Sequence, residues 1–199
     1  MKSASRTVFS IALLSTSLLL AACSPKFDWR EIRSNDAPYA VAMPSKPNTV
    51  TRQIDLNGSQ VAMTMTVSTV EGVTFAVGTA ELPDATQAQV SLNSMKTALV
   101  KNIVGTIKEE KVLTMPHGTA GGQLAVTEIQ ALGAAGANGD EQVRVLFARF
   151  VAKDKRVYQL VVTGVEKTVK RELADTFFTS FKLNLSLIHI SEPTRQEAI

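Results

Sequence analysis

Few side chains in this sequence could carry out covalent chemistry or bind a metal. The 199 residues include one cysteine, Cys23, and two histidines, His117 and His189. A single cysteine excludes a disulfide scaffold and a cysteine-rich zinc site. The net charge of +3 is small and dispersed, which argues against nucleic acid as a partner. We therefore expect no metal, no cofactor and no nucleic acid.

Cys23 follows a segment with the layout of a secretion signal. Lys2 and Arg6 form a basic start, and Val8–Leu20 is apolar apart from Ser and Thr. Such a segment is too short to span a bilayer stably. It ends in a sequence that resembles the lipobox of bacterial lipoproteins, Leu20-Ala21-Ala22-Cys23.

The lipobox resemblance implies that residues 1–22 are a signal peptide, which signal peptidase II removes by cutting between Ala22 and Cys23. It also implies a diacylglyceryl group on the Cys23 thiol and an acyl chain, such as palmitate, on its new amino group. Two or more acyl chains hold a protein on a membrane. Ser24, where Asp would retain the protein in the inner membrane, favours a periplasm-facing place on the outer membrane. The alternative is an ordinary signal peptide followed by a buried free cysteine.

His117 is the candidate for a catalytic base. A hydrolase would pair it with a serine or threonine, but the chain has no Gly-x-Ser-x-Gly turn to present such a nucleophile. The sequence around it, Met115-Pro116-His117-Gly118, predicts a loop. We therefore favour a surface histidine and no enzymatic activity, with a periplasmic hydrolase as the alternative.

Four methionines offer a second alternative, the handling of copper(I), because thioethers are ligands for that ion. Met63 and Met65 are two residues apart, and Met43 and Met115 could complete a site. The same spacing is typical of the inward face of a strand, so we favour core packing.

One glycine-rich segment does not have the composition of a phosphate-binding loop. Gly133–Gly139 is rich in glycine, but Asp140 and Glu141 follow it instead of the Lys and helix of a phosphate-binding loop, so we expect a hairpin loop.

The C-terminal segment Leu185–Arg195 resembles the translation of a sequencing adapter read in one frame. We therefore expect residues 185–199 to be an artefactual tail, without function for His189; the alternative is a genuine apolar tail.

Alternating apolar residues predict the strands of the first half of the chain. Asn57-Gly58 and Glu71-Gly72 have the composition of hairpin turns. One face of the third strand is expected to point inward through Val61, Met63, Met65 and Val67, and the next strand through Val73, Phe75 and Val77. The expected strands are Tyr39–Met43, Thr49–Leu56, Gln60–Val70 and Val73–Leu82.

The period then changes to that of a helix. Asp84 is the expected N-cap, Gly105 the residue that ends the helix, and the apolar stripe is Ala88, Leu92, Met95, Leu99 and Ile103. A second helix is predicted over Glu166–Lys182. Further strands are expected at Thr106–Met115, Gln123–Ala131, Gln142–Val151 and Val157–Thr163.

This order predicts an α+β domain, an antiparallel sheet with helices packed on it, over residues 39–184. Residues 23–38 are expected to form a lipidated tether, with Trp29 docked on the fold beside Phe27 and Ile32. The domain resembles the PsbP-like fold, named after an extrinsic subunit of photosystem II. The resemblance rests on Met43-Pro44-Ser45-Lys46-Pro47, Phe75-Ala76-Val77, the mid-chain helix and Phe177-Phe178-Thr179-Ser180-Phe181.

The resemblance implies a binding or assembly module and brings no catalytic residues with it. We therefore expect a lipid-anchored, non-catalytic lipoprotein of the bacterial envelope. Its partners would be the membrane, through the acyl chains on Cys23, and an envelope protein or a small ligand. We expect any binding groove between the sheet and the Asp84–Gly105 helix, with the glycine-rich loop near its rim.

Overall fold

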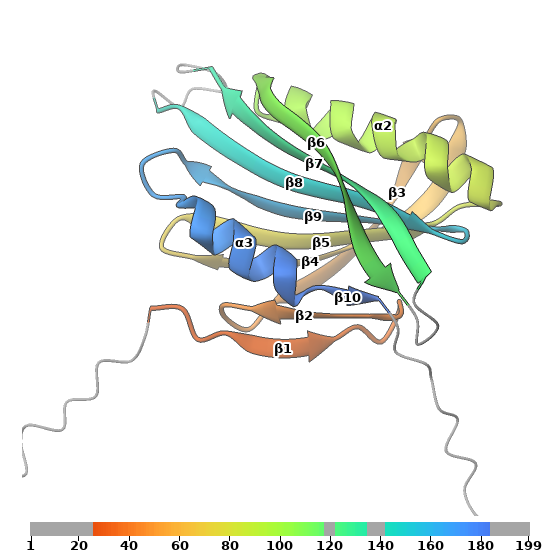
Figure 1. The fold of residues 1–199 in the computed structure, drawn as a ribbon, viewed down its shortest axis with the longest axis horizontal. Helices are drawn as coiled ribbons and strands as arrows, with labels where there is room; N and C mark the ends of the chain where they lie inside the picture. Colours follow the sequence, from red (N-terminus) through yellow and green to blue (C-terminus); the bar gives the residue numbers. More distant parts are fainter. Residues whose placement is uncertain (1–25, 118–121, 135–141, 184–199) are drawn as a thin grey trace, which may run out of the picture.

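The computed structural model describes residues 26–117, 122–134 and 142–183. The lipobox, most of the glycine-rich loop and the 185–199 tail lie outside the described residues. Within them, two antiparallel sheets and two helices form an α+β fold, as predicted from the sequence (Figure 1). The elements are β1 (Arg30–Arg33), β2 (Tyr39–Met43), β3 (Asn48–Leu56), β4 (Ser59–Val70), β5 (Val73–Glu81), α2 (Ala85–Asn102), β6 (Gly105–His117), β7 (Gly122–Gly133), β8 (Arg144–Lys153), β9 (Arg156–Val165), α3 (Arg171–Ser180) and β10 (Lys182–Leu183).

The larger sheet has seven strands in the order β3-β4-β5-β9-β8-β7-β6, and the smaller has three in the order β1-β2-β10. Tight hairpins join neighbouring strands, as expected. Asn57 and Gly58 both have positive φ, at 55° and 83°, and so do Glu71 and Gly72, at 52° and 75°. A two-residue turn of this kind matches the twist of the strands it joins.

Both faces of the seven-stranded sheet are covered over its central strands. Face A, defined by Phe75, is covered by α3 and the three-stranded sheet, and face B, defined by Ala76, is covered by α2. Val73, Phe75 and Val77 are buried on face A, as predicted. Each such side chain contributes roughly 1.5–3 kcal/mol through burial.

The four residues of β4 that were predicted to point inward all pack against the face B core, and the second half of the strand is also buried on face A, which was not predicted. Val61 and Met63 are buried on face B, while Met65 and Val67 are only half-buried. Further along, Thr66 and Ser68 are buried on face A. The reason is that the β2 region covers them: Tyr39 Oη donates to Thr66 Oγ1 at 3.2 Å, and Ser68 shares a 2.6 Å hydrogen bond with Ser45.

Helix α2 begins as predicted but ends differently. Asp84 is its N-cap and accepts a 2.8 Å hydrogen bond from the Gln87 backbone. At the other end Val104, not Gly105, has the positive φ, at 47°. Gly105 has little space for a side chain, because a Cβ there would lie 2.7 Å from Ile103 Cδ1 and 3.0 Å from the Leu132 carbonyl oxygen. A β-branched residue in the left-handed region is strained.

The C-terminal helix is shorter than the predicted Glu166–Lys182. α3 covers Arg171–Ser180, because Thr168 and Val169 form a separate turn on the Val165 carbonyl and Lys182 pairs with Ala40 in the smaller sheet. Neither described helix is both long and apolar enough to cross a bilayer.

The expected tether is partly folded. Residues Arg30–Arg33 form β1 and pair with β2, so the packed region begins well before residue 39. Trp29 docks on the fold as predicted: its ring lies 6.2 Å from that of Phe27 and 5.4 Å from that of Phe75. Phe27 and Ile32 also pack against the face A core.

Replacement of Val104 by glycine should stabilise the protein by about 0.5–1 kcal/mol. The change removes the steric strain of a Cβ atom at positive φ, which costs about 1–2 kcal/mol. Part of this gain is offset because glycine raises the conformational entropy of the unfolded chain. Thermal unfolding of the wild type and Val104→Gly measures the difference. Val112→Gly is the matched control, since Val112 is also exposed but lies within a strand, where glycine should destabilise. A Val104→Gly variant no more stable than the wild type would contradict the strain.

Candidate functional site

A cavity of about 720 Å³ lies on face A, between the C-terminal part of β6 and the corner where α3 meets β10. Its apolar wall comes from the sheet and from the end of α3. Strands β6 to β9 place this wall because their alternate side chains point to face A. The apolar lining residues are Leu113, Met115, Pro116, Val126, Val151, Leu160, Phe178, Phe181 and Leu183.

The cavity is not where the sequence analysis expected a groove. Most of the space between the sheet and α2 is filled by core residues, with Ala88, Leu92 and Met95 packed in one cluster with Ile129 and Phe150. A small hollow of about 180 Å³ remains there, between α2 and the strands β7 and β8. A hollow on the α2 side lies at the C-terminal end of the helix, beside β6. The glycine-rich loop contributes no described residue to any of these spaces.

The charged side chains that line the cavity are basic. Arg149 and Lys182 contribute cations and His117 an imidazole, while Thr114 and Thr179 add hydroxyl groups. Among the described lining residues there is no carboxylate. Lys182 is paired with Glu31 at 3.2 Å, outside the cavity lining. The cavity therefore combines an apolar wall with two cationic groups, each of which is also paired with a carboxylate outside the lining.

His117 is the last residue of β6, not part of a loop, which corrects the expectation for residues 115–117. Pro116 is tolerated beside it because β6 is an edge strand. The His117 ring is half-buried and lines the cavity. It makes no hydrogen bond or ion pair with a described side chain, so the structure shows no base–nucleophile pair at this position.

A buried carboxylate lies next to the cavity. Glu128 on β7 is opposite Lys111 on β6 and Arg149 on β8, so the three side chains form a row across neighbouring strands. Lys111 Nζ lies 3.1 Å from Glu128 Oε1, and Arg149 Nε donates to Oε2 at 2.5 Å. Arg171, the first residue of α3, donates to Oε1 as well. We call these four residues the Glu128 cluster.

The surroundings of Glu128 set its charge. Burial raises the pKa of the Glu128 carboxyl, but hydrogen bonds from Arg171, Arg149 and Lys111 outweigh burial and hold that pKa below its ordinary value. Glu128 is therefore ionised at neutral pH. The Arg149 guanidinium also lies 4.8 Å from the centre of the Phe178 ring, so the cluster fixes both ends of α3 against the sheet.

The four methionines do not form one set. Met63 and Met65 are on face B, where their Sδ atoms lie 3.9 Å and 3.5 Å from Gln159 Nε2. Met43 and Met115 belong to the face A core, on the other side of the sheet. A copper(I) site built from all four is therefore wrong. Within residues 26–117, 122–134 and 142–183, no group of three or more His, Cys, Asp or Glu is placed to hold a metal ion.

Comparison with known proteins identifies the fold. The chain is similar to cyanobacterial PsbP, CyanoP, of Synechocystis sp. PCC 6803, with a TM-score of 0.50 and 13% identity over 82% of this chain and 96% of that one. The domain has a PsbP-like fold. It also aligns with a protein of Bacteroides thetaiotaomicron, with a TM-score of 0.42 and 10% identity, over 79% of this chain but about half (49%) of that one. No protein-family model and no curated sequence matches the chain.

The sequence alone did not identify the Glu128 cluster of this PsbP-like domain. Glu128 and Arg149 occupy face A positions in strands whose neighbouring face A residues, such as Val126 and Val151, are apolar. A charged residue at a position that the alternating pattern assigns to the apolar face of a strand is the signal that could have identified them. Their pairing still needs the register of the strands, which the alternation does not give.

Loss of the Glu128 charge should destabilise the protein. Glu128→Gln removes the carboxylate that Lys111, Arg149 and Arg171 share. Arg171 keeps its ion pair with Asp175, and Lys111 keeps a longer one with Glu109. We expect a loss of about 2–3 kcal/mol at neutral pH, because the three cations are partly exposed. Urea unfolding followed by Trp29 fluorescence measures it. Glu172→Gln, at an exposed position one residue after Arg171, is the control and should cost little.

The same variants test the pH dependence. Because folding lowers the pKa of Glu128, its stabilising effect is present above the ordinary carboxyl pKa of 4.5 and is lost as the pH falls through the lower folded value. The stability difference between wild type and Glu128→Gln should therefore shrink in acid. A difference that stays constant down to pH 2 would contradict this assignment.

Proposed function

We propose that this protein is a lipid-anchored, periplasm-facing binding module of the bacterial outer membrane, and that the face A cavity holds its ligand. The observation that carries the proposal is the composition of the cavity. An apolar wall with Arg149, Lys182 and His117 and no described carboxylate fits a small ligand that has an apolar body and an anionic group. A fatty-acyl carboxylate is one ligand of this chemistry.

The folded N-terminal segment supports a specific arrangement on the membrane. Only four positions separate Cys23 from Phe27, which packs against the core. That length of chain reaches at most about 14 Å. An anchor on Cys23 would therefore hold the domain close to the bilayer. Figure 1 shows the first described residues at one end of the molecule and β10, which lines the cavity, toward the other. The cavity would then lie toward the end of the domain that is farther from the anchor.

Binding in the cavity can be tested with a fluorescent fatty acid, dansyl-aminoundecanoic acid, added to the full-length protein in detergent. Met115→Trp fills the cavity and should weaken binding at least about tenfold. Val112→Trp, on the same strand but exposed on face B, should leave binding unchanged. The matching dansyl alcohol should bind more weakly than the acid. Equal binding by both variants, with both unfolding cooperatively, would overturn the cavity as the site.

The anchor is tested separately. Wild-type protein produced in a Gram-negative host should partition with membranes and incorporate labelled palmitate, because Cys23 would carry the acyl chains. Cys23→Ala removes the only thiol of the chain and should be unlabelled and released. A Cys23→Ala variant that still partitions with membranes, or an unlabelled wild type, would contradict the lipoprotein assignment.

A further inference from the structure

In the part of the chain that the structure describes, the two sheets have four outer edges, and three of these are protected against pairing with another strand. β6 contains Pro116 and a register shift between Ile107 and Glu109, and four charged residues follow each other at 108–111. β1 is short and charged, and β10 has two residues. Short length, charge, proline and irregular register are the devices that protect sheet edges.

β3 has few of these devices. It runs for nine residues, Asn48–Leu56, in unbroken register with β4 and contains no proline. No described strand pairs with its other side. Leu56 and Ser59 form the hydrogen-bonded pair that closes the β3–β4 hairpin. In an antiparallel pair, every second residue of β3, counted back from Asp55, therefore points its backbone N–H and C=O groups away from β4. These residues are Thr49, Thr51, Gln53 and Asp55, which offer backbone donors and acceptors to an added strand.

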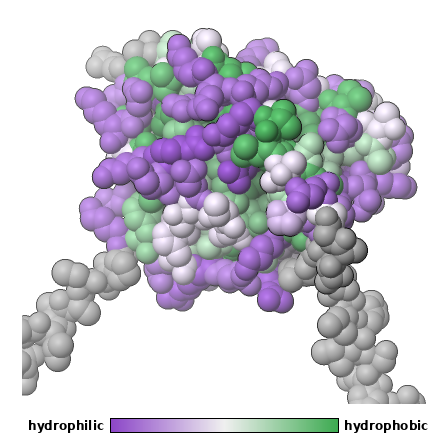
Figure 2. All heavy atoms as spheres, in the orientation of Figure 1, coloured by the Kyte–Doolittle hydropathy of each residue, from purple (hydrophilic) through white to green (hydrophobic). Residues whose placement is uncertain are grey.

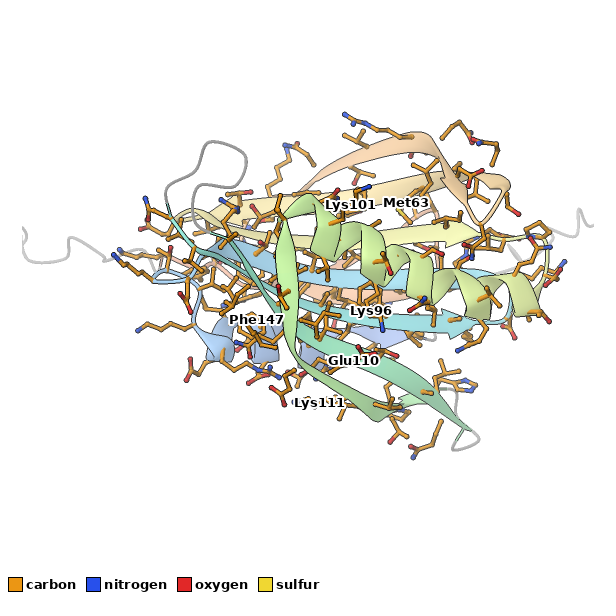
Figure 3. The ribbon with its side chains drawn as sticks, turned by 90° about the horizontal axis from the view of Figure 1, so that it is seen from above. Met63, Lys96, Lys101, Glu110, Lys111 and Phe147 are labelled. Atoms are coloured by element: carbon orange, nitrogen blue, oxygen red, sulfur yellow. The ribbon has the colours of Figure 1, made fainter. Side chains whose placement is uncertain are left out.

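Side chains next to this edge form a binding surface on face B. Val50, Arg52 and Ile54 of β3 and Met63 and Met65 of β4 line a hollow of about 260 Å³. The side chain of Val50 is 50% exposed although it is apolar. In Figure 3, viewed from above, β3 and the adjoining part of β4, where Met63 is labelled, extend beyond α2. The helix therefore leaves this part of face B uncovered.

Arg52 gives this surface a charge preference. Its guanidinium is exposed and forms no ion pair or hydrogen bond with any residue that the structure describes. Its neighbours on the same face of β3 are Val50 and Ile54. A strand added at this edge would be stabilised by an acidic side chain opposite Arg52 and apolar side chains on either side of it.

A second copy of this chain does not supply that pattern. In an antiparallel pair of two β3 strands, opposite residues lie on the same face of the sheet. The face B residues of β3 include Val50, Arg52 and Ile54 but no acid, and its one acid, Asp55, is on face A. Self-pairing would therefore leave Arg52 without a counter-ion.

We propose that the open edge of β3 binds an extended segment of a partner protein by strand addition, and that the segment carries an acidic residue between apolar residues on one face. Backbone hydrogen bonds to Thr49, Thr51, Gln53 and Asp55 would supply affinity. Arg52 and the adjoining hollow would supply the preference for sequence. This surface is separate from the face A cavity, so the two proposals can fail independently.

The test uses the model peptide Thr-Val-Thr-Glu-Thr-Val-Thr-amide, labelled with fluorescein at its N-terminus, and the full-length protein in detergent micelles. We expect the peptide to bind and to slow hydrogen exchange in residues 48–56 but not around the cavity. Replacement of its Glu by Lys should weaken binding about fivefold, because the pair with Arg52 becomes a repulsion. The variant Arg52→Glu should reverse this preference.

Gln53→Pro tests the backbone contribution. The substitution removes an outward N–H from the edge without removing a hydrogen bond to β4, and should abolish peptide binding. Gln53→Ala is the matched control and should bind normally. Equal binding of acidic and basic peptides, protection at the cavity instead of β3, or a dimer that Gln53→Pro dissociates would each overturn the proposal; the dimer would show that a second copy occupies the edge.

Discussion

The central strands β5, β8 and β9 must be covered on both faces, and this requirement explains most of the architecture. Face A carries large rings: Phe75 lies 5.4 Å from Trp29 and 5.6 Å from Phe177, so the N-terminal segment and α3 meet over one strand. Face B carries small residues at the centre, including Ala148 on β8, a strand that α2 contacts, and these allow the helix to pack closely. The surface over these layers is mostly hydrophilic, with apolar atoms gathered over β6 (Figure 2).

The Glu128 cluster follows from the same requirement. Face A continues from β8 onto β7 and β6, where α3 provides the cover but begins with the charged residue Arg171. The buried Glu128 carboxylate at this boundary is bonded to cations from two strands and a helix, so its charge is compensated. Arg149 then extends from the cluster toward Phe178 and into the cavity lining. The structural ion cluster and the proposed ligand site therefore share a residue.

The sequence predicted the features that depend on neighbouring residues. Alternation gave the strands, Asn57-Gly58 the hairpin, and Asp84 the start of α2, because each depends on contacts within a few positions. It missed β1 and β10, since four and two residues are too few to show a period. It also missed the Glu128 cluster, whose members Arg149 and Arg171 are 21 and 43 positions away and meet only through strand register and helix docking.

The short connection between Cys23 and Phe27 limits how a membrane-anchored form of this protein could act. Phe27 is fixed by its contacts with Trp29 and Phe75, and Lys26 is paired with Glu71 in the turn between β4 and β5, at 3.3 Å. A lipid on Cys23 would therefore hold this end of the domain at the bilayer instead of letting the domain swing on a long tether. With the cavity toward the other end, its lining residues would lie away from the point at which the anchor enters the lipid layer. Such a geometry favours a ligand delivered through the periplasm over one taken directly from the lipid layer that holds the anchor.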